Sequence, residues 1–281
     1  MQLRLGSRIL DLSTPKVMGV LNVTPDSFSD GGRFPGVDAA LAQAERMAGE
    51  GAAIVDVGGE SSRPGAAPVP VQAELDRVIP VIEAIRARID VAVSIDTSKP
   101  EVMRAAAAAG AAMINDIFAL RAEGALAEAA RHDLAVCLMH MQGEPRTMQE
   151  NPEYGDVTEE VAGFLADRVA ACAAAGVARE RITVDPGFGF GKTAAHNLTL
   201  LAGLGRLLRL ELPLTVGLSR KSTLGALTGR PVDDRMPAGI AAAVLAVERG
   251  AHIVRTHDVG PTIDALVIAG AVLQNRTSHD P

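Results

Sequence analysis

The chain has 281 residues, 48% of them apolar and only 2% aromatic, and its formal net charge at pH 7 is −7. This length fits one large domain, and the negative charge argues against a nucleic-acid or anionic-membrane partner. No apolar run reaches the roughly 18 residues of a membrane span, and residues 1–13 lack the apolar core of a signal peptide. Two cysteines, Cys137 and Cys172, are too few for a disulfide framework, so a cytoplasmic location is expected.

The predicted elements begin with a hairpin and continue as a repeat of strand and helix. Residues 3–12 place apolar side chains around a Gly-Ser turn, which is typical of a short hairpin. Apolar strand-like runs then alternate with Ala- and Leu-rich helical stretches. The runs are 16–22, 53–59, 91–96, 112–116, 135–140, 182–185, 214–219 and 252–257. About eight such units predict an α/β fold, a (β/α)8 TIM barrel forming one domain over residues 1–281, because an open doubly wound sheet ordinarily has fewer strands.

Polar side chains stand at or beside the end of each predicted strand. They are Asn22, Asp56, Glu60, Asp96, Asn115, Asp116, His140, Asp185, Ser219, Lys221, Arg255 and His257. The residues before the strands are mostly Ala, Leu or Pro with scattered charges. In a parallel barrel the carboxyl ends of the strands converge on one pocket, so we expect these polar groups to face one another.

Three of the acceptors, Asp96, Asn115 and Asp185, end different strands near the predicted mouth of the barrel. A buried carboxylate is costly unless it is paired, so each residue alone is equally compatible with a capping or salt-bridge role. Together they match a ligand with an amidine-like edge of N–H donors.

Basic residues are concentrated near the same strand ends of this acidic chain: Arg63, Lys221, Arg255 and His257. Arginine binds phosphate as a fork and lysine as a point charge, so this group suits a diphosphate, although any one of them alone is as readily a solvated surface charge. The six histidines and two cysteines show no spacing of a metal cage. A Mg²⁺ site needs only one or two protein oxygens besides phosphate and water, and Asn22 offers one.

Three segments are rich in glycine. Residues 23–38 and 58–72 are longer than ordinary strand-to-helix loops and are predicted to be lids, with a plain surface insertion as the alternative. DPGFGFGKT, residues 185–193, is not a Walker A loop, because Pro186 occupies the position of its first glycine. We interpret it as a loop whose backbone approaches a flat ligand closely, with Phe188 or Phe190 available for packing.

These segments resemble the dihydropteroate synthases. MGVLNVTPDSFSDGG (18–32) and GGESSRPGA (58–66) are similar to the two signature segments of that family. SIDTSKPEV, MINDI, DPGFGFGKT, GLSRKS and RTHDV follow in the family's order, so the resemblance covers essentially the whole chain. One departure is Ser62, where the family often carries threonine; the hydroxyl is kept, and only details of packing around the second substrate are put in doubt.

The resemblance implies a site residue by residue. The pterin-binding positions correspond to Asp96, Asn115, Asp185 and Lys221, with pocket walls at Met139, Phe190 and Gly217. The pyrophosphate and Mg²⁺ positions correspond to Asn22, Arg63, Arg255 and His257, of which Asn22 is the metal ligand. The para-aminobenzoate positions correspond to Phe28, Ser62, Pro64 and Ser222. The residues expected to act in the reaction itself are Lys221, Arg63, Asp185, Arg255 and His257.

The resemblance also implies a reaction, in which a dihydropterin pyrophosphate loses pyrophosphate and the arylamine of para-aminobenzoate attacks the freed carbon. The alternatives are a pterin-binding methyltransferase domain and a non-catalytic pterin-binding protein. The methyltransferase needs no pyrophosphate cluster, and loss of Arg63 or Lys221 would have favoured the non-catalytic protein. The family usually forms homodimers through helices near the C-terminus, and residues 238–251 or 265–273 supply either that face or ordinary core.

Overall fold

A computed structural model of the chain describes residues 1–24, 35–61 and 65–277. It begins with the antiparallel hairpin β1 (Gln2–Leu5) and β2 (Arg8–Asp11), as predicted. Eight parallel strands follow in the order β8-β7-β6-β5-β4-β3-β10-β9. Their bounds are β3 (Lys16–Asn22), β4 (Ile54–Gly58), β5 (Ala92–Asp96), β6 (Met113–Asp116), β7 (Ala135–Met139), β8 (Ile182–Asp185), β9 (Thr215–Gly217) and β10 (Ile253–Thr256).

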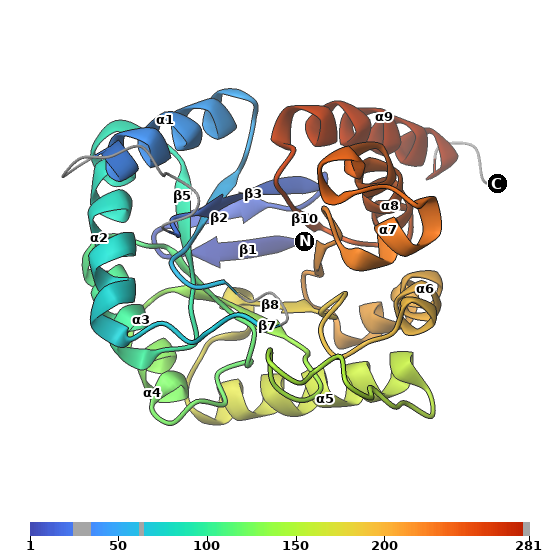
Figure 1. Cartoon of the computed structure of the whole chain (residues 1–281), viewed down its shortest axis with the longest axis horizontal. Helices are drawn as coiled ribbons and strands as arrows, with labels where there is room; N and C mark the ends of the chain where they lie inside the picture. Colours follow the sequence, from blue (N-terminus) through green and yellow to red (C-terminus); the bar gives the residue numbers. More distant parts are fainter. Residues whose placement is uncertain (25–34, 62–64, 278–281) are drawn as a thin grey trace.

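The two ends of this sheet meet beside β9. A parallel bridge joins Val184 of β8 to Leu214, and the Val184 amide donates to the Pro213 carbonyl over 3.0 Å. The predicted TIM barrel is therefore confirmed as a near-closed barrel. Helices surround it in Figure 1. They are α1 (Pro35–Gly49), α2 (Val71–Arg88), α3 (Pro100–Ala108), α4 (Ala125–Arg131), α5 (Val157–Ala174), α6 (Ala194–Ala202), α7 (Ser222–Thr228), α8 (Met236–Glu248) and α9 (Val259–Thr277).

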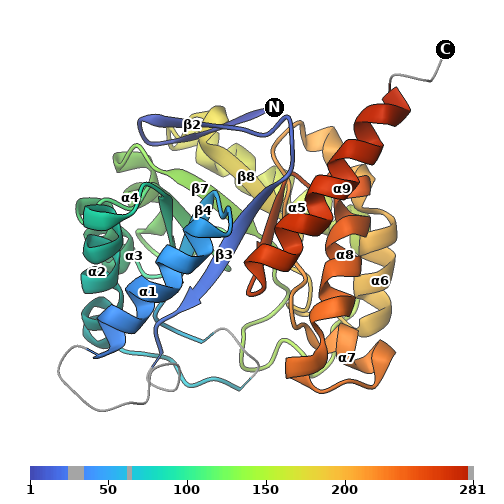
Figure 2. The same cartoon turned by 90° about the horizontal axis from the view of Figure 1, so that it is seen from above.

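Alternate residues of each strand face different cores, because side chains along a strand point to opposite faces. In β4, Val55 and Val57 belong to the outer core between strands and helices. Ile54 of the same strand belongs to an inner core at the amino-terminal end of the barrel. The hairpin closes that end with Leu3 and Leu5, which are buried in the inner core, and Figure 2 shows the hairpin beyond the start of β3.

The strand register brings the carboxyl ends to one level at the other end of the barrel. Asn22 pairs with Gly58, Gly58 with Asp96, and Asp96 with Asn115. Residues at paired positions of a parallel sheet lie on the same face, so these side chains share the barrel interior. Within the described ranges, no helix combines the length and hydropathy needed to cross a membrane.

Candidate active site

A cavity with about 340 Å³ of empty space lies at these carboxyl ends. Its walls combine charged, amide and apolar side chains with backbone of the Gly-rich loop. They are Asp96, Asn115, Ile117, Met139, Asp185, Gly187, Phe188, Phe190, Gly217, Lys221 and Arg255. The structure thus gathers into one cavity all seven residues that were predicted to bind a pterin, together with Arg255. The mixture of apolar walls with a few convergent polar groups is typical of a small-molecule site.

The floor of the cavity is a network of buried charges around Arg255. Its Nε donates to Asp56 Oδ2 over 2.7 Å and its Nη2 donates to Asp96 Oδ2 over 2.6 Å. Asn115 Nδ2 donates to the same Asp56 oxygen over 2.9 Å. Asp56 is fully buried, and its Oδ1 has no hydrogen-bond partner among the described residues.

Asp56 was counted among the polar strand ends but was not assigned to the site. The structure shows that it orients both Asn115 and Arg255, which makes it part of the cavity's framework. The sequence signal was an acidic residue in the middle of an apolar strand, where burial demands a charged partner.

Burial shifts the pKa of the two carboxyl groups and the lysine of the cavity. It raises the pKa of Asp96 to about 7 against the opposing effect of Arg255. It raises the pKa of Asp185 to about 6, although the Gly187 amide and the charge of Lys221 lower it. Burial, followed by the neighbouring charge of Arg255, lowers the pKa of Lys221 to about 8. Carboxylates and an amine that titrate this close to neutrality are characteristic of functional sites.

The Gly-rich loop between β8 and α6 forms one wall. Gly187 has a φ of +68°, and a Cβ at this position would lie 1.9 Å from the carbonyl oxygen of His140, so glycine is required there. The Gly187 amide donates to Asp185 Oδ1 over 2.7 Å, whereas the other carboxylate oxygen makes no hydrogen bond to described residues. Phe188 belongs to the outer core, and Phe190 packs with Met139 at the mouth of the barrel. Lys221 Nζ lies 4.1 Å from the centroid of the Phe190 ring.

Three predicted residues lie outside the walls of the cavity. Asn22 ends β3, and a Cβ built on Gly58 would lie 3.7 Å from its Oδ1 and 3.5 Å from the Asp96 Cβ, so Asn22 and Asp96 are close neighbours. His257 follows β10, with its Nδ1 3.1 Å from Ser219 Oγ, and burial lowers its pKa to about 4. Ser222 is exposed at the first residue of α7.

The remaining predicted residues, Phe28, Ser62, Arg63 and Pro64, fall outside the described residues. A metal site was predicted only at Asn22. The described part of the chain holds no cluster of three histidine, cysteine or acidic side chains suited to a metal ion. The Asn22 side chain is half-buried at the rim and makes no hydrogen bond to described residues. Its amide oxygen therefore fits the single protein oxygen that Mg²⁺ requires beside phosphate ligands.

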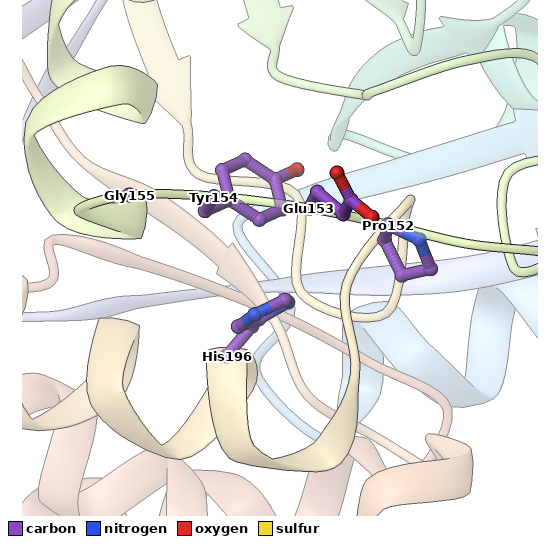
Figure 3. Close-up of a pocket in the computed structure, with 5 residues that line it drawn as sticks. All are labelled: Pro152, Glu153, Tyr154, Gly155 and His196. Carbon is purple, nitrogen blue, oxygen red and sulfur yellow. The ribbon is translucent and has the colours of Figure 1, made fainter.

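A second hollow lies on the outer side of the Gly-rich loop, where Figure 3 shows Tyr154 and His196 among its walls. The Tyr154 hydroxyl donates to the Gly191 carbonyl over 2.7 Å, and the Tyr154 ring meets His196 edge-on at 5.0 Å. None of the strand-end carboxylates lines this hollow. Its residues brace the loop from outside, and the chemistry resides in the cavity at the strand ends.

Comparison with known proteins agrees with this geometry. The family model of pterin binding enzymes matches residues 18–257. The fold and the cavity thus define a pterin-binding barrel.

Relatives and solved structures narrow this class. The curated dihydropteroate synthase of Escherichia coli strain K12 is 53% identical over 264 residues, which cover 94% of each chain. A crystal structure of the Yersinia pestis dihydropteroate synthase with a sulfonamide drug complex superposes with a TM-score of 0.93 at 51% identity, covering 98% of this chain and 100% of that one. The Xanthomonas albilineans enzyme solved with 4-aminobenzoic acid gives a TM-score of 0.92 at 52% identity, with 97% and 98% covered. The chain belongs to the dihydropteroate synthase family.

Proposed function

We propose that this chain condenses 6-hydroxymethyl-7,8-dihydropterin pyrophosphate with para-aminobenzoate to give 7,8-dihydropteroate and pyrophosphate, a transferase step of folate biosynthesis. The observation that carries the proposal is the cavity in which Asp96, Asn115, Asp185 and Lys221 meet inside a barrel of this family. The relative solved with 4-aminobenzoic acid supports the second substrate. The extent of identity to dihydropteroate synthases favours this reaction over that of a pterin-binding methyltransferase.

The cavity offers hydrogen-bond acceptors for the N–H groups of the pterin and a donor for its ring acceptors. The ring N–H and the exocyclic amine of the pterin form a donor edge that one carboxylate accepts as a fork. In Asp185, Oδ2 has no partner among the described residues, and Oδ1 accepts only from the Gly187 amide and keeps a second lone pair. Asp96 and Asn115 meet the other ring nitrogens, and Lys221 binds ring acceptors. Met139, Phe190 and Gly217 enclose the flat ring, since they line the same cavity.

The reaction breaks the C–O bond between the pterin methylene and pyrophosphate, whose electron pair leaves with the anion. The electron-rich dihydropterin spreads the positive charge on the methylene carbon. The neutral amine of para-aminobenzoate then attacks that carbon and loses a proton, so no strong general base is required. Positive groups placed at a departing anion are commonly the largest contribution to catalysis.

Arg63, Arg255 and His257 are proposed to hold the pyrophosphate. In the structure Arg255 uses Nε and Nη2 for Asp56 and Asp96, while Nη1 makes no hydrogen bond to described residues. One edge of the guanidinium therefore remains for an anion above the cavity. The adjoining carboxylates restrain its orientation, which reduces the side-chain entropy lost when the anion binds.

Mg²⁺ is proposed to bind the pyrophosphate with Asn22 as its protein ligand, and it would neutralise charge on the leaving group. Para-aminobenzoate is proposed to contact Phe28, Ser62, Pro64 and Ser222, of which the structure describes Ser222 at the start of α7. Both free cysteines are buried thiols, which supports a cytoplasmic location.

The decisive experiment is a steady-state assay of pyrophosphate release from the pterin substrate. Release should depend on both para-aminobenzoate and Mg²⁺, and the pteroate product should form in equal amount. Asn22→Ala should raise the Mg²⁺ requirement more than it weakens binding of an unphosphorylated pterin. Release that is indifferent to para-aminobenzoate would contradict the synthase reaction, and full activity in excess EDTA would contradict the metal proposal alone.

A further inference from the structure

Lys192 is a buried lysine next to the pterin cavity that the proposed mechanism does not use. Its side chain is 2% exposed, and a buried ammonium is costly unless every N–H has a partner. Lys192 Nζ lies 2.9 Å from His140 Nδ1, 2.9 Å from the Gly187 carbonyl oxygen and 3.0 Å from the Phe190 carbonyl oxygen. The three N–H donors of the ammonium thus have three acceptors.

Two of these acceptors belong to the wall of the pterin cavity. Gly187 presents its amide to Asp185 and its carbonyl to Lys192, so the ammonium and the carboxylate hold opposite sides of one residue. Phe190, at the other end of this segment, supplies its carbonyl to Lys192 and its ring to Lys221. One charged side chain therefore fixes both ends of the 187–190 segment.

The third acceptor requires a neutral histidine. His140 is 6% exposed, and its ring meets Phe164 edge-on at 4.9 Å. Burial, and next the charge of Lys192, lowers the pKa of His140 to about 3, so the ring is neutral at physiological pH. Its Nδ1 then carries a lone pair toward Lys192, with the N–H on the other ring nitrogen.

We propose that Lys192 is a positioning residue for pterin binding, which holds the 187–190 segment so that the Gly187 amide stays on Asp185. This inference rests on the proposed function, because Lys192 would affect pterin binding only through Asp185, the carboxylate proposed to accept the pterin. A structural lysine that only fills space would leave the ionisation of Asp185 unchanged.

The charges around both groups agree with this role. Lys192 faces His140 after β7, Asp185 on β8 and Lys221 before α7. Asp185 also faces Arg255 on β10 and Cys137 on β7. Burial lowers the pKa of Lys192 to about 7, while the charge of Asp185 opposes this change. The Gly187 amide that Lys192 holds lowers the pKa of Asp185, and so do the charges of Lys221, Arg255 and, last, Lys192 itself.

The test is Lys192→Met, which removes the ammonium and keeps an unbranched apolar side chain one atom shorter. The first readout is the titration of the Asp185 carboxyl, followed by ¹³C NMR of the unliganded protein. The midpoint of this titration should rise by about half a pH unit or more. Two effects that favour the carboxylate are lost, namely a nearby positive charge and the fixed position of the Gly187 amide that donates to Asp185. The second readout is calorimetric titration with 6-hydroxymethylpterin at pH 6, where Lys192 is charged and Asp185 is near its midpoint. The affinity should fall about tenfold, because the 187–190 segment loses its anchor and less of Asp185 is ionised.

Arg181→Met is the matched control. Arg181 is 5% exposed and lies just before β8, the strand that Asp185 ends. It also donates to three carbonyls, those of Ala129, His132 and Leu134. This variant loses an equally buried cation and should be less stable, but its Asp185 midpoint and pterin affinity should match the wild type.

The outcomes separate this inference from the proposed function. An unchanged Asp185 midpoint in Lys192→Met, with normal pterin binding by the wild type, would overturn the role of Lys192 alone. A wild type that binds no pterin would overturn the proposed function and this role with it. If Lys192→Met does not fold, His140→Leu takes its place, since it removes one of the three acceptors. It should raise the midpoint by a smaller amount, and no change there would equally contradict the proposal.

Discussion

Asp56 and Arg255 are 199 residues apart in the chain, and their ion pair organises the whole floor of the cavity. Arg255 also pairs with Asp96, so the two acids share one guanidinium, and Asn115 donates to the same Asp56 oxygen as Arg255. Removing one partner of a buried pair leaves an uncompensated charge, which is strongly destabilising. The pterin-binding side chains therefore depend on Asp56, which does not itself line the cavity.

At the scale of one residue, Asp185→Asn tests directly whether this carboxylate accepts the donor edge of the pterin. The amide keeps the shape, but it places an N–H donor against the donor edge of the pterin. Loss of this charge-assisted fork should weaken pterin affinity by roughly 2–4 kcal/mol. Calorimetric titration with a simple pterin measures the effect, and a nearly unchanged dissociation constant would remove Asp185 from this role.

Pterin affinity should also fall as the pH is lowered from 8 to 5. Both carboxyl groups have raised pKa values, about 7 for Asp96 and about 6 for Asp185. Each is a charged acceptor at both oxygens only while it is ionised, because protonation turns one oxygen into a donor. Protonation therefore competes with binding, and affinity is lost as the pH falls through these two values. In Asp185→Asn the lower of the two steps should be missing from the pH profile. A wild-type profile that stays flat over this range would contradict the assignment of either carboxylate as an acceptor.

At the scale of elements, a clamp formed by Lys99, Glu60 and Glu74 joins the end of β4 to the helices α2 and α3. Lys99, just before α3, donates to Glu60 after β4 and to Glu74 in α2. Glu60 also accepts from the Val69 amide over 3.0 Å. The residues between Glu60 and Val69 include the predicted pyrophosphate and para-aminobenzoate contacts, so the clamp anchors the base of that loop.

Lys99→Met should lower the free energy of unfolding by about 3–5 kcal/mol, because Glu74 is fully buried and would be left without its cation. Urea unfolding followed by circular dichroism measures the loss. The double variant Lys99→Met/Glu74→Met should recover most of it, since an apolar pair of similar volume carries no buried charge. Equal stability of the wild type and the single variant would mean that the clamp contributes nothing.

At the scale of the whole molecule, apolar side chains remain exposed on the last two helices. Leu245 of α8 and Val267, Ile268 and Val272 of α9 are 41%, 64%, 67% and 53% exposed. Figure 2 shows α8 and α9 side by side at one flank of the barrel. We propose that this surface forms a homodimer interface, because apolar residues gathered on one face favour association.

Ile268→Asp should shift the chain toward a monomer in light scattering at micromolar concentration, because a carboxylate would be desolvated at the contact. Ile9→Asp is its matched control, since Ile9 is 65% exposed on the hairpin, away from α9. The control should remain dimeric. A wild type that is monomeric under these conditions would refute the interface.

The alternation of strand and helix, the hairpin and the family were all readable in the sequence, because strand periodicity and the glycine-rich segments are local patterns. The strand-end rule also predicts that Asp96, Asn115, Asp185 and Lys221 share one pocket, and the structure brings them together there. Strands of a parallel barrel end on one side whatever their detailed packing, so such residues are found from their position alone.

Only the tertiary structure decided which charges are partners. Arg255, expected to face a diphosphate, has Asp56 and Asp96 on two of its nitrogens, and these pairs depend on strand register across 199 and 159 residues. Lys192 reads in the sequence as one more polar residue of a glycine-rich loop, yet it is buried with three acceptors from two segments. Burial and pairing are properties of neighbours brought together by folding, and they change the pKa and the role of a side chain without leaving a local pattern.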